Sequence, residues 1–394
     1  MRDSRSNPQT LFDNAAALVP VLRDRAVETC QARRLPESTL ADFRAAGLFS
    51  VLKPKELGGQ EVRFDVALRI AGILARGDGS AAWVWNLLVM HELIAALLPR
   101  KAQLEYWQKP DVLGASSFAA NGRALPAAGG FRLSGKWSFC SGIDCADWVF
   151  LGAKCFLSEA DAQKPEIRWV LIPKSDCKIV DDWHVFGLRG TGSKSVVVTD
   201  AFVPEHRTMS YQDLLDGRSP GAKIHGGPIY RAPLWAIFTL GICAPATGIA
   251  KGACDCFITE FKTRVYGFDY SAQAKNPSVQ LRLAEATALT DAAELLYNRS
   301  LERIVDKIMA DDPLSVEDRV TSRRDQAYAV KMSTSAVELL LAAQGGRGLF
   351  EASPIQRALV DLHAMSGHIM AGWDMPALNF GQVLLGGSPA NPFY

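Results

Sequence analysis

The spacing of apolar residues along the 394-residue chain changes twice, and these two changes limit the folds that the chain can adopt. From about Leu11 to Leu98, and again from about Leu234 onward, apolar residues recur at the spacing of amphipathic helices. Between these parts, from about Val112 to Thr208, short β-rich runs are separated by Gly, Pro, Ser and Asp. This order predicts an α+β chain with a helical domain, a sandwich or barrel of antiparallel strands, and an up-and-down helical bundle.

The predicted boundaries are residues 1–110 for the N-terminal helical domain, 111–212 for the β domain, 213–233 for a connecting segment and 234–394 for the bundle. In the first domain, Gly77-Asp78-Gly79 is expected to separate two buried helices, with Ser80 as the cap of the second. In the bundle, residues 279–308 and 323–344 predict two long helices, the second closed by the glycine cluster at 345–348.

The composition narrows the class of protein. The chain has 43 basic and 42 acidic residues, so no charge excess indicates a nucleic-acid or membrane-surface partner. We find no segment that is long and apolar enough to span a bilayer, and the polar N-terminus lacks the apolar core of a signal peptide. We therefore expect a cytoplasmic protein without nucleic-acid or membrane partners.

The eight cysteines are scattered, without CxxC pairs, and are expected to be reduced and mostly buried. The six histidines show no HExxH pattern, so no metal site is predicted. The sequence lacks GxGxxG after a strand and GxSxG, and its GxxxxGK match at residues 130–136 is followed by Trp137 where a P-loop has Ser or Thr. Rossmann, P-loop and serine-hydrolase sites are therefore without support.

Two stretches of the β-rich part could bind a ligand. Trp137 and Trp148 flank a Ser141-Gly142 turn, which fits either buried strand aromatics or aromatic walls for a flat ligand with a directional hydroxyl at Ser141. Gly187-Leu-Arg-Gly-Thr-Gly-Ser193 combines close backbone approach with donors from Arg189, Thr191 and Ser193, as suits a ribityl or phosphate group. A solvent-facing hairpin turn explains the second stretch equally well.

The helical parts contribute further candidates, each with a structural alternative. Arg264 and the segment Gln344-Gly345-Gly346-Arg347 could contact phosphate, or could be surface charge and a helix C-cap. His91 is eight residues after Trp83 and could be a buried structural histidine. The apolar spacing of Ile355–Trp373 predicts one amphipathic helix that would present His368 as a general acid or base.

The order of helices, β domain and bundle resembles the acyl-CoA dehydrogenase fold over nearly the whole chain. LPESTLADFRAAGLFSVLKPKELGG is similar to the N-terminal region of that superfamily. The dehydrogenases carry a catalytic glutamate in a Tyr-Glu-Gly motif near the end of the bundle. This chain has Ser366-Gly-His-Ile-Met instead, which removes the base for abstraction of a substrate α-proton.

The closer resemblance is to the group D flavin monooxygenases, the oxygenase components of two-component systems such as the p-hydroxyphenylacetate and steroid-phenol hydroxylases. The segments that carry it are WSFCSGIDCADWVFLGA, WHVFGLRGTGSKSVVVTDAFVPEHRT, IYRAPLW and IQRALVDLHAMSGH. It implies a homotetramer that receives reduced FMN or FAD from a separate NAD(P)H:flavin reductase. Oxygen then forms a flavin C4a-hydroperoxide, which hydroxylates a small aromatic substrate of the phenol or indole type.

The resemblance also implies roles for single residues. Ser141 would be the hydroxyl beside flavin N5, His368 the acid or base near the substrate oxygen, and His91 a further catalytic residue. The flavin and substrate pocket would be formed by Trp83, Ser116, Phe139, Ser141, Arg189, Thr191, Gly192 and Ser193. Arg264, Gln344 and Gly345 would contact flavin phosphate, Arg264 from a neighbouring subunit. Asp361, about 10.5 Å before His368 along a helix, is expected to make a packing or subunit contact.

The chain departs from this family at several positions around the pocket. Cys145 stands where relatives have His, Val360 where Arg is common, and Cys140 replaces a frequent Ser, while Met370 stands where relatives can have an aromatic or polar residue. These departures affect the expected substrate more than the use of flavin. Two alternatives remain at this point, an acyl-CoA dehydrogenase-like FAD oxidoreductase and a non-catalytic helical assembly protein.

Overall fold

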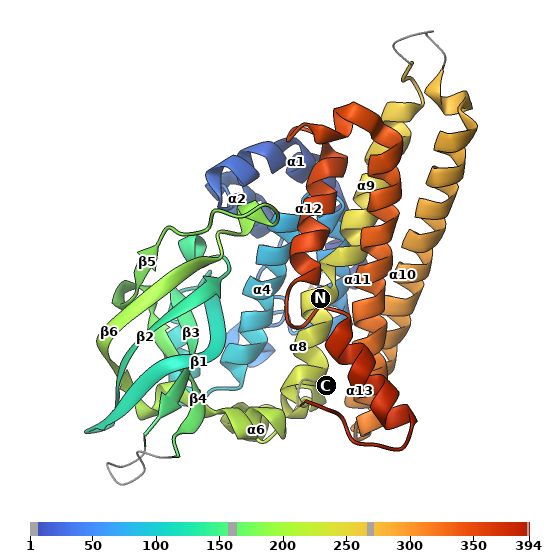
Figure 1. Cartoon of the computed structure of the whole chain (residues 1–394). Helices are drawn as coiled ribbons and strands as arrows, with labels where there is room; N and C mark the ends of the chain where they lie inside the picture. Colours follow the sequence, from blue (N-terminus) through green and yellow to red (C-terminus); the bar gives the residue numbers. More distant parts are fainter. Residues whose placement is uncertain (1–6, 157–163, 266–271, 392–393) are drawn as a thin grey trace.

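The computed structural model describes residues 7–156, 164–265, 272–391 and 394. Five helices precede the strands: α1 (Pro8–Ala32), α2 (Glu37–Ala45), α3 (Phe64–Ala75), α4 (Gly79–Ala96) and α5 (Arg100–Tyr106). All residues of α4 are buried, because it runs between the sheet and the helical bundle (Figure 1). The cap of α4 differs from the prediction. The Asp78 carboxylate caps the helix instead of Ser80. It accepts from the backbone N–H of Ser80, which has no partner within the helix, at 3.0 Å.

The strands form one seven-stranded sheet in the order β5-β6-β2-β1-β3-β4-β7. Their bounds are β1 Gly114–Ala127, β2 Gly130–Cys140, β3 Trp148–Cys155, β4 Glu166–Pro173, β5 Lys178–Val180, β6 Lys194–Pro204 and β7 Thr208–Ser210. The prediction of purely antiparallel strands is wrong for one pair, because β1 and β3 run parallel. Strand β2 returns as a hairpin on one side of β1, and β3 then pairs with the free edge on the other side.

The remaining chain is helical: α6 Tyr211–Leu215, α7 Pro220–Ile224, α8 Leu234–Cys243, α9 Pro245–Phe261, α10 Pro277–Met309, α11 Val316–Gln344, α12 Pro354–Ser366 and α13 Asp374–Leu384. The two predicted long helices correspond to α10 and α11, which lie side by side (Figure 1). Gly345, with φ +65°, ends α11 as expected.

Two expectations about the helical part are wrong. The stretch Ile355–Trp373 is not one helix, because α12 ends at Ser366 and the chain forms a turn before α13. Ile369, placed on the apolar face of that helix, is 65% exposed. By length and composition, Leu234–Phe261 is apolar enough to cross a membrane, contrary to the sequence analysis; 94% of its most apolar window is buried inside the protein, so packing in the core explains its apolar character.

Candidate active site

A chain of hydroxyl groups lies where β2 and β6 approach α4. Ser141 follows β2, and its Oγ is 2.7 Å from Oγ of Ser193, which precedes β6. Oγ of Ser193 is in turn 2.6 Å from Oγ1 of Thr191, and Thr191 donates to the carbonyl oxygen of Leu188 at 2.8 Å. Nε1 of Trp83, on α4, donates to Ser141 at 3.3 Å. The structure therefore connects four of the predicted flavin-site residues in one buried series of hydrogen bonds.

The backbone conformation at Gly192 and Gly142 holds these hydroxyl groups together. Gly192 has φ +53°, and a Cβ at this position would lie 2.7 Å from the Asp144 carboxylate and 2.9 Å from a backbone carbonyl. Glycine is therefore required between Thr191 and Ser193 for both conformational and steric reasons. The hydrogen bond from Gly142 N–H to the Thr191 carbonyl, at 2.9 Å, fixes the Ser141 turn against this loop.

Phe139 is held in an unusual conformation next to the hydroxyl chain. Its φ is +62°, a region that costs free energy for a bulky side chain, and its ring is 71% exposed. The ring meets that of Trp183 edge to face, with 6.0 Å between the centroids. A strained backbone that presents an aromatic ring to the outside is the kind of feature that ligand sites retain, and the pair offers a surface for a flat ring system.

The two tryptophans that flank the Ser141 turn do not form this surface. Trp137 is fully buried in the core of the sheet, and its Nε1 donates to the carbonyl of Gly152 at 2.8 Å. Trp148 packs beneath the guanidinium of Arg207, 5.0 Å from its ring centroid. The interpretation as buried strand aromatics is therefore correct for Trp137, and the aromatic pair at the surface of this region is Phe139 and Trp183.

His368 lies in the turn after α12. The backbone N–H of Met370 donates to its Nδ1 at 3.1 Å, and the Met370 carbonyl accepts from the buried Arg323 at 2.8 Å. The imidazole meets the Trp83 ring edge to face, with 5.6 Å between centroids, so it adjoins the side chain that donates to Ser141. Burial of the ring among protein atoms lowers the pKa of His368 to about 4, and the positive charge of Arg323 is the second, smaller cause. His368 is therefore neutral at pH 7, and because Nδ1 accepts, its proton is on Nε2.

His91 is paired with Ser116 two helical turns along α4 from Trp83, roughly 12 Å along the axis. Its Nδ1 lies 2.7 Å from the Gly114 carbonyl, and its Nε2 lies 2.7 Å from Oγ of Ser116. A carbonyl can only accept, so Nδ1 carries the proton and Nε2 accepts from Ser116. Burial lowers the pKa of His91 to about 4. The histidine is fully buried, whereas Ser116 in front of it is partly accessible.

Sequence analysis did not identify the aromatic group beside this pair. Phe118, two residues after Ser116 on β1, meets the His91 ring at 6.1 Å and stacks on Trp169 at 3.6 Å. Phe238, on α8, meets Phe118 edge to face at 5.4 Å. The alternation along β1 places residues 116 and 118 on one face, which is the signal that could have predicted this contact. The group makes an apolar surface next to the Ser116 hydroxyl.

Arg189 and the bundle candidates lie outside the hydroxyl chain. Arg189 lines a cavity of about 560 Å³ between α1, its own loop and the start of α12, and its Nη1 is 3.5 Å from Glu351. Arg264 donates to the Gln344 carbonyl at 2.9 Å and pairs with Glu260 at 3.3 Å. Among the described residues, these contacts keep Arg264, Gln344 and the adjoining Gly345 within the bundle of their own chain.

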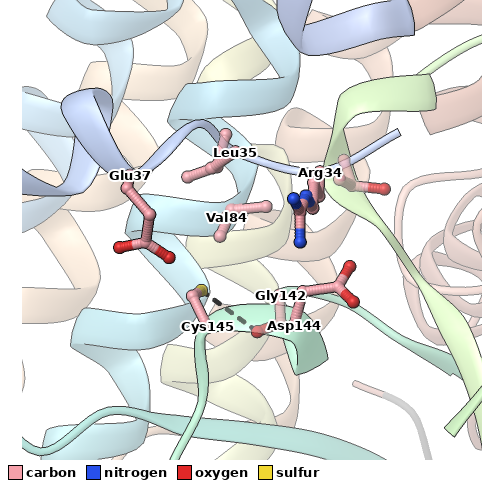
Figure 2. Close-up of a pocket in the computed structure, with 8 residues that line it drawn as sticks. Arg34, Leu35, Glu37, Val84, Gly142, Asp144 and Cys145 are labelled. Atoms are coloured by element: carbon pink, nitrogen blue, oxygen red, sulfur yellow. Dashed lines mark hydrogen bonds between the residues drawn. The ribbon is translucent and has the colours of Figure 1, made fainter. Parts of the chain in front are cut away.

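Cys145 lies behind the Ser141 turn. Its Sγ is 3.1 Å from the Gly142 carbonyl, to which it donates, and it lines a small cavity of about 20 Å³ with Val84 and Thr191 (Figure 2). This volume suffices for about one water molecule. Burial raises the pKa of Cys145 to about 12, so the thiol stays protonated and is not a nucleophile. In the described part of the chain, no group of three or more His, Cys, Asp or Glu side chains could hold a metal ion.

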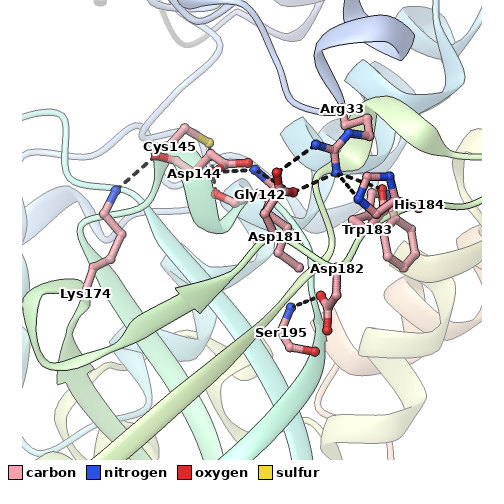
Figure 3. A network of polar contacts seen from close by, with 11 residues as sticks. Arg33, Gly142, Asp144, Cys145, Lys174, Asp181, Asp182, Trp183, His184 and Ser195 are labelled. Carbon is pink, nitrogen blue, oxygen red and sulfur yellow. Dashed lines mark hydrogen bonds and ion pairs between the residues drawn. The ribbon is translucent and has the colours of Figure 1, made fainter.

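A polar network fastens the neighbouring loops to α1 (Figure 3). Lys194 pairs with Asp144 at 2.9 Å and lies 3.7 Å from Asp181, which in turn pairs with Arg33 at the end of α1 at 2.7 Å. The Asp182 carboxylate accepts from the backbone N–H of Ser195 at 2.9 Å. These contacts fix the loop that carries Trp183 relative to the hydroxyl chain.

Comparisons with known proteins identify the family and the fold of the chain. Residues 240–373 match the family "Acyl-CoA dehydrogenase, C-terminal domain". The chain is 34% identical to the oxygenase component of an FADH(2)-dependent resorcinol hydroxylase from Rhizobium sp. (strain MTP-10005), over 97% of this chain and 96% of that protein. The crystal structure of 3-HSA hydroxylase from Rhodococcus sp. RHA1 has a TM-score of 0.91 and 30% identity, with 98% of both chains covered.

A third relative is a solved structure with a ligand, XiaF from Streptomyces sp. in complex with FADH2 and glycerol. It has a TM-score of 0.89 and 28% identity, with 98% of this chain and 97% of that chain covered. The fold is therefore acyl-CoA dehydrogenase-like. From the identity over nearly its whole length, the chain belongs to the family of oxygenase components of flavin-dependent monooxygenases.

Proposed function

We propose that this protein takes reduced FMN or FAD from a separate NAD(P)H:flavin reductase and uses it with O₂ to hydroxylate a small aromatic substrate, a phenol or an indole. The observation that carries the proposal is the arrangement around α4. Trp83 joins the Ser141 hydroxyl chain to His368, and His91 with Ser116 lies two turns further along the same helix. A reduced flavin, when bound, supplies the oxygen chemistry, and the protein supplies position and dryness.

The residues present fit a flavin ring. The Phe139 and Trp183 rings offer a surface for its flat face. Ser141 would offer its hydroxyl oxygen to N5 at the edge of the ring. No carboxylate is present in the turn from Ser366 to Met370, which leaves the dehydrogenase alternative without its base.

The His91–Ser116 pair suits a phenol. A phenol hydroxyl can donate to Oγ of Ser116, whose own proton is directed to Nε2 of His91. Because the pKa of His91 is about 4, the pair orients the hydroxyl in the resting site without removing its proton. The proton passes through Ser116 to His91 as the aromatic ring is oxygenated, since the phenol oxygen becomes more acidic as positive charge develops on the ring.

His368 has the complementary property. Because its Nδ1 accepts from Met370, its Nε2–H can donate a hydrogen bond to an oxygen atom of the bound reactants. Because Nδ1 is occupied by the Met370 N–H, this tautomer favours hydrogen-bond donation from Nε2–H over the role of a base. His368 is also held by a turn that Arg323 fastens, which replaces the rigid helix expected from the sequence.

Further parts of the proposal concern the whole protein. We infer a cytoplasmic homotetramer with the domain boundaries given by the sequence, in which Arg264, Gln344 and Gly345 contact flavin phosphate and Arg264 does so from a neighbouring subunit. Exposed apolar side chains on α10 and after α11, such as Leu281, Leu295 and Leu349, support subunit contacts through the bundle.

Reconstitution tests the proposed function. Purified protein is supplied with a flavin reductase, NADH, FMN or FAD, and a panel of phenols and indoles that includes resorcinol. We expect an oxygenated product that depends on O₂ and on the reductase, and chemically reduced flavin should replace the reductase. Failure of the protein to bind either reduced flavin would refute the proposal.

A further inference from the structure

The hydrogen atoms of the hydroxyl chain have only one possible order. The Leu188 carbonyl can only accept, and the 2.8 Å contact between its oxygen and Oγ1 of Thr191 requires the Thr191 proton. Nε1–H of Trp183 and the backbone N–H of Thr191 donate to the same oxygen at 3.2 and 3.1 Å. Ser193 must then donate to Thr191, and Ser141 must donate to Ser193. Nε1–H of Trp83 takes one of the two lone pairs of Ser141. The hydrogen-bonding capacity of Ser141 that remains for a ligand is a single lone pair, which is an acceptor.

If the protein binds flavin as proposed above, this order of hydrogen atoms determines which redox state of the flavin Ser141 can bind. Reduced flavin carries a hydrogen on N5 and is a donor at that atom, whereas oxidised flavin has a lone pair there and is an acceptor. We propose that the Leu188 carbonyl, held by the Asp361 carboxyl, sets the direction of this hydroxyl chain, so that Ser141 accepts from N5–H and the site discriminates against oxidised flavin. Oxidised flavin would place its N5 lone pair against the remaining lone pair of Ser141, so two acceptors would repel each other and N5 would lack a donor.

Asp361 holds the Leu188 backbone, at which the series of hydroxyl groups ends. Its Oδ1 accepts from the backbone N–H of Leu188 at 2.6 Å, and the side chain is buried on α12. Leu188 has φ +52°, so its conformation requires such support. The loop also lies directly on α12, because a Cβ on Gly187 would be 1.9 Å from the Val360 carbonyl. Asp361 is therefore a positioning residue, and the helix that carries it leads into the turn of His368.

Asp361 supports Leu188 through one carboxyl oxygen, whatever its protonation state. The buried Asp78 carboxylate faces it across the cap of α4, and Arg357, one turn earlier on α12, lines the same small cavity. Burial and the charge of Asp78 raise the pKa of Asp361 to about 7. Both the protonated and the ionised carboxyl keep an oxygen that accepts from Leu188. Asparagine has the same acceptor, and leucine has the same size without it.

The test measures flavin binding without turnover. Dissociation constants for oxidised and reduced flavin are determined anaerobically by fluorescence titration, and their ratio is compared among variants. In Thr191→Val the end of the chain is lost, so Ser193 can donate to Ser141 and Ser141 can donate to oxidised flavin. We expect the preference for reduced flavin to fall roughly tenfold, the effect of about 1.4 kcal/mol. Ser193→Ala, which also frees the Ser141 proton, should lower the ratio in the same direction.

Asp361 is tested by a matched pair of variants. Asp361→Asn should keep the ratio of the unmodified protein, and Asp361→Leu should lower it. Ser117→Ala removes a buried hydroxyl of β1 that donates to the Ser138 carbonyl and is not part of the hydroxyl chain. This variant should leave the ratio of the two dissociation constants unchanged. Circular dichroism confirms that each variant is folded.

The outcomes separate this inference from the proposed function. If the unmodified protein binds no reduced flavin, the function itself is wrong. If it binds reduced flavin but Thr191→Val and Ser193→Ala keep its ratio, the direction of the hydroxyl chain does not select the flavin. If both of those variants lower the ratio and Asp361→Leu does not, the assignment of Asp361 is wrong.

Discussion

The two histidines of this site carry their protons on different ring atoms, and each assignment follows from one backbone group. The carbonyl of Gly114 places the proton of His91 on Nδ1, and the N–H of Met370 places that of His368 on Nε2. Burial keeps both rings neutral at pH 7. One histidine is thus prepared to accept a proton through Ser116, and the other to donate a hydrogen bond.

The role of Ser116 can be tested against its neighbour on β1. We expect Ser116→Ala to lower kcat/KM for phenols roughly 10- to 100-fold, because general-base assistance through the hydroxyl is lost. Its affinity for reduced flavin should change little. Ser117→Ala, which affects a hydroxyl on the other face of the strand, should retain the kinetic constants. Steady-state kinetics with a resorcinol-type substrate provide the measurement, and equal losses in both variants would contradict the role of Ser116.

The sequence selected several residues that the structure brings together, without showing how they connect. Ser141, Thr191 and Ser193 were candidates from their sequence context and from the resemblance, and Trp83 from the resemblance alone. The structure brings all four into one series of hydrogen bonds. Asp361 was expected to make only a packing or subunit contact. Its bond to Leu188 joins positions 173 residues apart in the sequence, and spacing along one helix cannot reveal such a contact.

At the scale of elements, long periodic segments were predicted well and short connections were not. The helices α10 and α11 follow from their apolar spacing over many turns. The end of α12 at Ser366 was missed because the apolar pattern continues through Trp373. The Ser366 hydroxyl donates to the His363 carbonyl at 2.9 Å, and Gly367 follows, so local hydrogen bonding and glycine end the helix there. The parallel pairing of β1 and β3 is non-local and has no signature in either strand.

The attachment of α12 to the 188–193 loop leads to a prediction about pH and stability. Burial, with the charge of Asp78, raises the pKa of Asp361 from 3.8 to about 7 in the folded protein. Between pH 4 and 7 the folded state therefore binds more protons at this group than the unfolded state, and stability contributed by the protonated form is lost as pH rises. Asp361→Asn lacks this loss. Relative to the unmodified protein, the variant should gain about 2 kcal/mol of unfolding free energy between pH 5 and pH 8.

Urea unfolding at the two pH values measures this gain, and Asp318 supplies a control. Although burial opposes it, hydrogen bonds from Lys307 and Ser315 lower the pKa of Asp318 below its usual value. Asp318 is thus ionised in both states at pH 5 and above. The stability difference caused by Asp318→Asn should be the same at pH 5 and pH 8. A difference for Asp361→Asn that is equally independent of pH would contradict the prediction.

At the scale of the whole molecule, the bundle exposes several large apolar side chains. Leu281 and Leu295 on α10 are each 72% exposed, Leu349 after α11 is 82% exposed, and Leu385 after α13 is 90% exposed. Apolar side chains of this size on one bundle are typical of contact surfaces. Arg264, at the end of α9, is occupied by Gln344 and Glu260 of its own chain, so the hydroxyl chain and the phosphate candidates form two separate groups.

This separation leads to a test of whether each flavin site is shared between two subunits. Ser141→Ala alters the flavin ring site of its own chain, and Arg264→Ala would alter the phosphate contact that a chain gives to its partner. Each variant alone should have low activity. In mixed oligomers of the two variants, a site is intact when the chain with Ser141 receives Arg264 from the other variant, which random assembly gives in about one quarter of sites.

Co-expression with two affinity tags isolates the mixed oligomers, and product formation per subunit is then measured. We expect activity to rise towards one quarter of that of the unmodified protein. As a control, mixing Ser141→Ala with Thr191→Val, which lie in the same hydroxyl chain, should restore nothing beyond the mean of the two variants, because every chain then carries a defect in its own ring site. If the Arg264 mixture behaves like this control, Arg264 acts within its own chain, as its contacts with Gln344 and Glu260 allow.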